Sequence, residues 1–235
     1  MIPYYILETE HFDTTISTYS ADATIQITHE FKDSPPQIFY EKSYDNSFKD
    51  FLYYKLKVES IAKLEGRAYG RSEPFWEFIK ITNKEMFYNE NNKILILKTS
   101  KDTYNSFVSC FSKDDHDTKL KFSTKRLNFK SVIESGYSKG VQGVWFGNIK
   151  DTQLKNEALY GSTLEASERY KELLDNGATI TNISLSVDYN NTNIKIMLTK
   201  ECGIILYTNK CFNEEKEVLD FIIFIYQNLI KPNTL

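Results

Sequence analysis

The 235-residue sequence lacks long hydrophobic runs, paired cysteines and a basic segment at its start. Its longest apolar stretch, residues 218–230, is interrupted by polar residues and is too short to cross a bilayer of about 30 Å. The three cysteines, Cys110, Cys202 and Cys211, show neither CxxC nor Cys/His spacing, which argues against a disulfide framework and a zinc site. We therefore expect a cytoplasmic protein without a signal peptide or a membrane segment.

The sequence also lacks the common catalytic and phosphate-binding motifs. Neither GxxxxGK[ST] nor GxGxxG occurs, and the three histidines stand in no nucleophile signature. The densest acidic cluster, Asp114-Asp115-His116-Asp117, contains the ligand types that divalent metals prefer. In an extended loop, however, only Asp115 and Asp117 would share a face, so a solvated turn is favoured. We expect no cofactor, no metal and no catalytic residue, with a metal-dependent nuclease or hydrolase as the second alternative.

The sequence contains enough hydrophobic residues to form a core, and its positive and negative charges are nearly balanced. Hydrophobic residues make up 41% of the chain and aromatic residues 14%, which indicates a folded protein of one large domain or two small ones. The chain has 29 Lys+Arg against 32 Asp+Glu, and the net charge of -3 excludes a uniformly basic nucleic-acid binder. A local basic stripe remains compatible with this balance.

Hydrophobic periodicity and turn residues predict the order of the elements. Strands are expected over residues 2–7, 14–18, 23–31, 37–41, 75–82, 94–99, 106–111, 119–123, 141–147, 179–188, 193–199 and 203–207. Helices are expected over residues 47–65, 129–134, 163–176 and 213–230. Asn46 and Asn213 are the expected N-caps of the first and last helices, and Ser162-Thr163-Leu164-Glu165 reads as a capping box.

This order predicts an α+β protein of two lobes, in which antiparallel sheets are each covered by a long helix. The N-terminal β-rich lobe, residues 1–125, contains helix 47–65, and the C-terminal α+β lobe, residues 126–235, contains helices 163–176 and 213–230. Both halves run three strands and then a long helix. A degenerate duplication is one interpretation of this repeat, and chance is the other.

A basic strand face is the most suggestive surface feature. In an extended strand Lys119, Lys121 and Lys125 share one face, which suits a phosphate backbone. The loop over residues 66–71 adds two arginines and a stacking aromatic. The alternative is a solvent-exposed edge strand whose lysines prevent pairing with another chain. The candidate nucleic-acid-binding residues are Arg67, Arg71, Lys119, Lys121, Lys125, Arg126 and Lys130.

The predicted terminal helix is apolar on several sides, so it must be enclosed. Either the chain's own core covers it, or another chain does, and Phe221, Phe224 and Tyr226 would then lie in an interface. We expect a non-catalytic accessory or assembly subunit of a bacterial or mobile-element complex, with phage (antiviral) defence suggested by composition. Its partner would be another protein or a second copy. Nucleic-acid binding to DNA or RNA through the basic strand face is the alternative.

Overall fold

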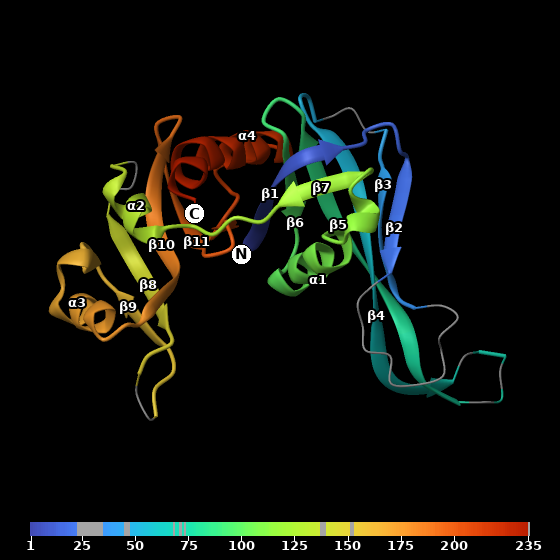
Figure 1. The fold of residues 1–235 in the computed structure, drawn as a ribbon, viewed down its shortest axis with the longest axis horizontal. Coiled ribbons are helices and arrows are strands. Elements are labelled where there is room, and N and C mark those ends of the chain that lie inside the picture. The colour runs from blue at the N-terminus through green and yellow to red at the C-terminus, as the bar shows by residue number, and fades with distance from the viewer. Residues whose placement is uncertain are drawn as a thin grey trace. The chain divides into compact units, whose positions relative to one another are not determined.

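The computed structural model describes residues 1–22, 35–44, 48–67, 69–70, 72, 74–136, 140–150 and 153–234. The protein is a mixed α+β protein built mostly of antiparallel strands, which confirms the predicted class (Figure 1). The strands are β1 Ile2–Phe12, β2 Thr18–Asp22, β3 Gln37–Lys42, β4 Leu52–Arg67, β5 Pro74–Asn89, β6 Ile94–Lys98, β7 Leu120–Ser123, β8 Val141–Gly147, β9 Glu157–Tyr160, β10 Thr179–Tyr189, β11 Thr192–Thr199 and β12 Gly203–Leu206. The α-helices are α1 Lys101–Phe111, α2 Phe129–Glu134, α3 Glu168–Asp175 and α4 Glu215–Ile225. The strand predicted over residues 23–31 lies outside the described residues.

The chain divides into two compact units. Unit 1 consists of Met1–Ile6 and Thr124–Leu235, and unit 2 is Leu7–Ser123. Strand β1 belongs to both, because its first residues pair with β12 and its later residues pair with β7.

Unit 2 orders its strands β2-β3-β4-β5-β6-β1, and β7 pairs with β1. Its core is aromatic. Tyr40 and Tyr54 are fully buried, and their rings meet edge to face with centroids 5.6 Å apart. Phe12 and Phe111 also contact the ring of Tyr40, at 5.7 and 5.9 Å between centroids. Aromatic pairs of this kind contribute about 0.5–1.5 kcal/mol beyond the area they bury, so the ring cluster fixes helix α1 on the sheet.

The prediction of a helix over residues 47–65 is wrong, because most of this segment is strand β4. Tyr54, Leu56 and Val58 are buried, whereas Lys55 is exposed and Lys57 is half-buried, so the side chains alternate between two faces. Tyr54 lies directly opposite Met86 on β5, and both side chains are fully buried, so the buried side of β4 continues onto its neighbour. The chain after β3 therefore continues into a strand, while the chain after β12 continues into helix α4, so the order of three strands and a long helix does not recur in the two halves.

The strand predicted over residues 106–111 is also wrong, because this segment lies in helix α1. The Ser100 side chain accepts a hydrogen bond from the Thr103 N–H at the helix start. Tyr104, Phe107 and Phe111 recur at helical spacing and are buried. The apolar face of the helix thus joins the aromatic core of unit 2.

Unit 1 orders its strands β1-β12-β11-β10-β8-β9, and helix α4 packs on one face of this sheet (Figure 1). That face carries side chains that are almost fully buried, among them Ile183, Leu185, Ile196 and Ile204. Helix α4 continues into a π turn, Tyr226–Ile230, and a 3-10 turn, Lys231–Asn233. The predicted strand over residues 141–147 and helix over residues 129–134 are confirmed as β8 and α2.

The two remaining helix starts differ from the predicted caps. Ser167, not Ser162, caps α3 by accepting a hydrogen bond from the Tyr170 N–H, while Thr163 adopts a left-handed backbone conformation. Residues 164–166 form a separate 3-10 turn before it. Helix α4 has Glu214 at its N-cap, and the preceding Asn213 N–H donates to the Glu217 carboxylate at 2.7 Å. That bond lowers the pKa of Glu217.

Candidate functional site

The most unusual surface is the outer part of the β4–β5 hairpin. Strand β3 pairs with β4 only as far as Val58, and β6 pairs with β5 only from Glu85 to Asn89. Strands β4 and β5 nevertheless stay paired as far as Arg67 and Pro74. Beyond Val58, no strand in the described part of the chain flanks this two-stranded ribbon (Figure 1). A two-stranded ribbon on its own is marginally stable in water, so this segment gains from an additional contact.

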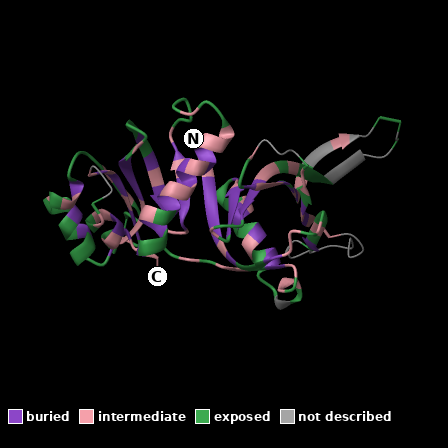
Figure 2. Ribbon diagram, turned by 90° about the horizontal axis from the view of Figure 1, so that it is seen from above, coloured by how far each residue is buried: buried purple, intermediate pink, exposed green. Residues whose placement is uncertain are grey.

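Three isoleucines on the ribbon form a surface that we call the isoleucine face: Ile61, Ile79 and Ile81. Ile61 lies directly opposite Ile79, and Ile81 lies two residues further along β5, so all three share one side of the ribbon. They are 40%, 43% and 54% exposed. Figure 2 shows the exposed and half-buried residues of this hairpin in green and pink. Their clustering is informative, because single exposed apolar residues are ordinary but contiguous ones mark contact sites.

The isoleucine face is not an extension of the hydrophobic core. The core-facing side of β4 carries Tyr54, Leu56 and Val58, which belong to the other side of the ribbon. Nearer the base of the ribbon, the side of the isoleucines carries polar pairs such as Lys57 with Asn83. The polar pairs Lys55–Glu85 and Lys57–Asn83 therefore separate the three isoleucines from Phe87, the buried core residue on the same side of the ribbon.

The ribbon tip contains the predicted basic loop. Tyr69 is fully exposed and is followed by Gly70 with a φ of +81°. Arg67 ends strand β4, but its side chain, and the whole of Arg71, lie outside the described residues. Nucleic-acid binding by this loop stays a prediction.

In unit 2 the basic strand face is matched by carboxylates. Lys121 lies 3.1 Å from Asp117 and 3.6 Å from Glu10, and Lys119 lies 3.6 Å from Asp13. Asp117, chiefly through a side-chain hydrogen bond, raises the pKa of Lys121. Hydrogen bonds from Thr15 lower the pKa of Asp13, and Lys119 acts in the same direction. These lysines therefore carry less unbalanced positive charge than the sequence pattern indicates.

The other predicted basic residues belong to unit 1. Arg126 and Lys130 are exposed, and Lys125 is half-buried. Their segment is anchored to the sheet, because the Leu127 N–H donates to the Lys200 carbonyl at 2.9 Å. Since Lys119 and Lys121 lie in unit 2, one continuous binding face over residues 119–130 stays a prediction.

Two of the three predicted interface residues are covered within unit 1. Phe221 is fully buried and Tyr226 is 2% exposed. The Phe221 ring contacts Tyr189 at 5.0 Å between centroids, and the half-buried Phe224 contacts the same ring at 5.2 Å. The chain's own hairpin therefore covers much of this helix. An intermolecular role for the helix stays a prediction.

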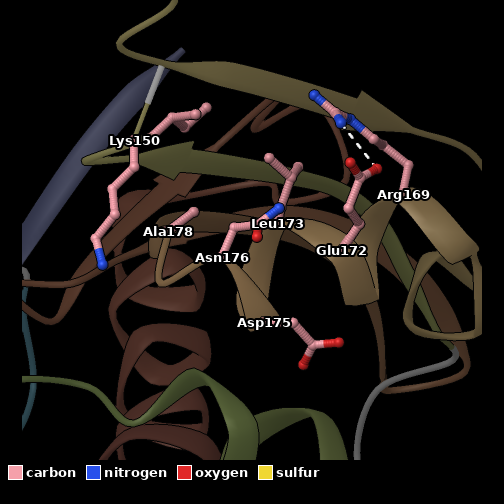
Figure 3. A pocket seen from close by; sticks show the side chains of 8 residues that line it. Lys150, Arg169, Glu172, Leu173, Asp175, Asn176 and Ala178 are labelled. Atoms are coloured by element: carbon pink, nitrogen blue, oxygen red, sulfur yellow. Dashed lines mark hydrogen bonds and ion pairs between the residues drawn. The ribbon is translucent and has the colours of Figure 1, made fainter. Parts of the chain in front are cut away.

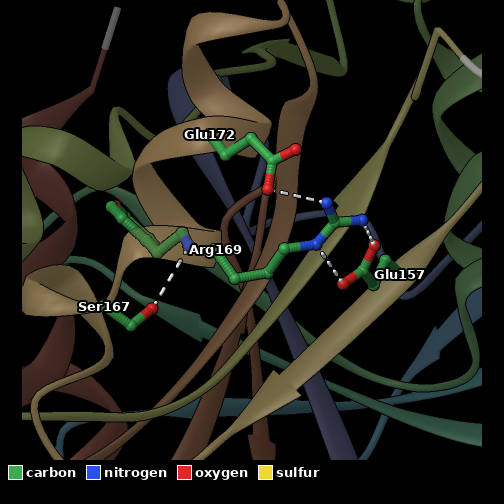
Figure 4. Close-up of polar contacts among 5 residues, drawn as sticks. Glu157, Ser167, Arg169 and Glu172 are labelled. Carbon is green, nitrogen blue, oxygen red and sulfur yellow. Dashed lines mark hydrogen bonds and ion pairs between the residues drawn. The ribbon is translucent and has the colours of Figure 1, made fainter.

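A pocket of about 430 Å³ lies beside helix α3 (Figure 3). Arg169 at its rim donates two hydrogen bonds to Glu157 and one to Glu172 (Figure 4). These bonds raise the pKa of Arg169 and lower that of Glu157. With its guanidinium occupied by two carboxylates, Arg169 has little capacity left for an anionic ligand. We therefore assign this arginine a structural role in tying strand β9 to helix α3.

The described side chains of the acidic cluster contact neighbouring protein groups. Within the described residues, no group of three or more His, Cys, Asp and Glu side chains is arranged to hold a metal ion. Asp117 binds Lys121, and the His116 Nδ1 lies 2.7 Å from the Tyr19 hydroxyl. Burial raises the pKa of Tyr19, and nearby Asp115 adds to the effect. His116 thus helps to fix its turn against strand β2.

The sequence pattern does not predict the isoleucine face. Ile79 and Ile81 fall in the strand predicted over residues 75–82, and Ile61 falls in the helix predicted over residues 47–65. The signal that they share a surface is the pairing register of β4 with β5, which sequence periodicity does not give.

Comparisons with known proteins identify no family. Among the described residues, no helix combines the length and apolar character that a membrane span requires. No protein-family model matches the chain, and no curated protein matches it either.

Proposed function

We propose that the protein is a non-catalytic assembly subunit that binds a partner protein through the isoleucine face. The observation that carries the proposal is the exposure of Ile61, Ile79 and Ile81 together on one side of the β4–β5 ribbon. A cytoplasmic complex of a bacterium or mobile element, including one in antiviral defence, is the setting that we propose from the composition.

The energetics favour a covered isoleucine face. Full burial of an isoleucine side chain stabilises a protein by about 1.5–3 kcal/mol. Covering three side chains that are 40–54% exposed would then contribute about 2–4 kcal/mol. A protein partner also supplies backbone groups, which the ribbon edges beyond Val58 accept by strand addition. A protein surface can both cover the three isoleucines and pair with the edges of the ribbon.

The test compares complex formation by two variants. The triple variant Ile61→Thr/Ile79→Thr/Ile81→Thr keeps β-branched residues in the strands while removing the apolar surface. The control is Leu174→Thr, because Leu174 on helix α3 is 39% exposed and lies in unit 1. Each protein is co-expressed with the products of its neighbouring genes, and the purified material is measured by light scattering.

We expect the wild-type chain and Leu174→Thr to form a complex of defined stoichiometry. The triple variant should keep its circular dichroism spectrum and be recovered without the partner. A complex that survives the triple substitution, or a wild-type chain that is recovered as a monomer with each of these products, contradicts the proposal.

A further inference from the structure

The sheet of unit 1 has a second face, opposite helix α4, with a different composition. We call it the aromatic face, and its defining residues are Gly143, Trp145, Tyr160, Ser184, Ser186, Lys195 and Tyr207. Tyr160 is 68% exposed and Lys195 is exposed, whereas Ile183 and Leu185 on the α4 side are fully buried. The aromatic face is therefore the side of this sheet on which large side chains meet solvent.

The first aromatic group lies on strands β8 and β9. The rings of Trp145 and Tyr160 meet edge to face, with centroids 5.4 Å apart. The indole leans along its own strand over Gly143, where a Cβ would come within 3.2 Å of two of its ring carbons. A larger residue at position 143 would push the indole away, so the glycine keeps this ring low on the sheet.

A second aromatic group faces the first across a floor of small polar residues. The Tyr207 hydroxyl donates to the Ser184 Oγ at 3.3 Å, and the Lys195 Nζ lies 5.2 Å from the centre of the Tyr207 ring. Gln142 donates from its Nε2 to the Ser186 Oγ at 2.9 Å. Ser184 and Ser186 are buried beneath these contacts, so the exposed surface of the face comes from the aromatic rings on both sides of the floor and from Lys195.

Positive charge adjoins this face. The Leu127 N–H donates to the Lys200 carbonyl, the Lys200 N–H donates to the Thr181 carbonyl, and the Thr181 hydroxyl donates to the Trp145 carbonyl. This row of bonds links the segment of residues 125–127 to Trp145 through Lys200 and Thr181. Because Leu127 is buried in the core and Arg126 is exposed, the extended backbone turns Arg126 away from the core.

The charged strand residues that we identify on this face are Lys195 and Asp188. Asp188 lies at the end of the β10–β11 hairpin and accepts a hydrogen bond from the Asn193 Nδ2 at 2.9 Å. The carboxylate is therefore next to the turn, away from Trp145.

We propose that the aromatic face binds single-stranded nucleic acid. The bases stack on Trp145 and Tyr160, and the phosphates contact Lys195 and Arg126. Exposed rings on a sheet whose opposite face is covered by helices can stack unpaired bases, and such stacking tolerates any sequence. A duplex does not fit, because its bases are already stacked on one another. This activity goes beyond the proposed protein interface and uses a different unit of the chain.

The experiment uses the fluorescence of Trp145. The chain has two tryptophans, Trp76 and Trp145, so Trp76→Phe leaves one reporter. This protein is titrated with oligothymidylate, oligouridylate and a DNA duplex of equal length at low ionic strength. We expect saturable quenching by the single strands and at least tenfold weaker binding of the duplex.

Variants then assign the binding to the face. Tyr160→Ala should weaken single-strand binding about tenfold, and Arg126→Gln should make it less dependent on salt. Tyr44→Ala is the control, because Tyr44 is 81% exposed and lies in unit 2. Circular dichroism checks that each variant is folded.

Three results would overturn the proposal. One is the absence of binding to either single strand, and another is binding that Tyr160→Ala leaves unchanged. The third is loss of the protein complex in Tyr160→Ala without an effect on oligonucleotides, which would make the face a protein interface. The isoleucine triple variant should bind single strands normally, so failure here is distinguishable from failure of the proposed function.

Discussion

Gly203 is the position at which a single methyl group should be most disruptive. It pairs directly with Tyr5 across strands β12 and β1. A Cβ at this position would lie 2.7 Å from the Tyr5 Cε1 and 2.7 Å from the Thr199 Oγ1, closer than such atoms approach in proteins. Tyr5 is only 2% exposed, so its ring has little room to move. Thr199 is fixed as well, because its hydroxyl accepts the Gly203 N–H at 3.0 Å.

The expected cost of Gly203→Ala follows from these two contacts. Overpacking a filled core costs about 1–3 kcal/mol. The Thr199 side chain must move as well, because the new Cβ meets its Oγ1, and a buried hydrogen bond worth about 1 kcal/mol is then lost. We therefore expect the free energy of unfolding to fall by about 2–4 kcal/mol, a large part of the ~5–15 kcal/mol that typically stabilises a domain.

Urea denaturation followed by tryptophan fluorescence and circular dichroism measures this loss. Gly161→Ala is the matched control, because the nearest atom to its new Cβ is the Cδ2 of the flexible Leu164 side chain, at 3.1 Å. The control should lose less than about 1 kcal/mol. In a Tyr5→Leu background, Gly203→Ala should cost less, since the ring is gone. A Gly203→Ala protein within about 0.5 kcal/mol of the wild type would refute the steric reasoning.

Three further predictions concern ionisable and hydroxyl groups. The Tyr40 and Tyr54 hydroxyls are buried and have no hydrogen-bond partner among the described residues. In urea denaturation, Tyr40→Phe and Tyr54→Phe should therefore be neutral or stabilise unit 2 by up to about 1 kcal/mol. A loss of stability larger than about 1 kcal/mol in either variant would contradict this prediction. Burial raises the pKa of both tyrosines, so the folded state keeps protons that the unfolded chain releases near pH 10. Stability should therefore fall as pH rises above about 10, and it should fall less steeply in the double variant Tyr40→Phe/Tyr54→Phe. Urea denaturation midpoints measured between about pH 9 and 11 test this prediction. Arg169 lowers the pKa of Glu157, so the small contribution of this exposed pair to the free energy of unfolding should be present at neutral pH and disappear as pH falls through that lowered pKa. Arg169→Met should make stability depend less on pH in the acid range. An unchanged pH profile of stability in this variant would argue against a contribution from the pair.

Elements with complete local signals were predictable from the sequence. The β10–β11 hairpin is an example, because its turn residues Asn190 and Asn191 both have positive φ angles, 48° and 61°. Asparagine tolerates this conformation, which a two-residue hairpin turn requires. Helix α2 was predictable for a similar reason, since Asn128 caps it by accepting the Ser131 N–H.

Strand β4 was misread because its sequence fits two periods. Phe48, Phe51 and Leu52 extend a helical pattern, whereas Tyr54, Leu56 and Val58 alternate as in a strand. The choice between them depends on β3 and β5, which pair with β4 on both sides. Contacts with distant segments override local propensity here. The same limit applies to the isoleucine face, since its exposure depends on where β3 and β6 stop.

The division of strand β1 between the two units also sets an order for folding. Unit 2 is one uninterrupted segment, Leu7–Ser123, so a ribosome has delivered all of it before most of unit 1 exists. Unit 1 must instead bring Tyr5 to Gly203, which closes a loop of most of the chain and is a slow type of contact to form. Synthesis therefore favours completion of unit 2 first. The first residues of β1 stay without their β12 neighbour until the last part of the chain emerges, and in that interval this segment is the one most in need of protection from aggregation.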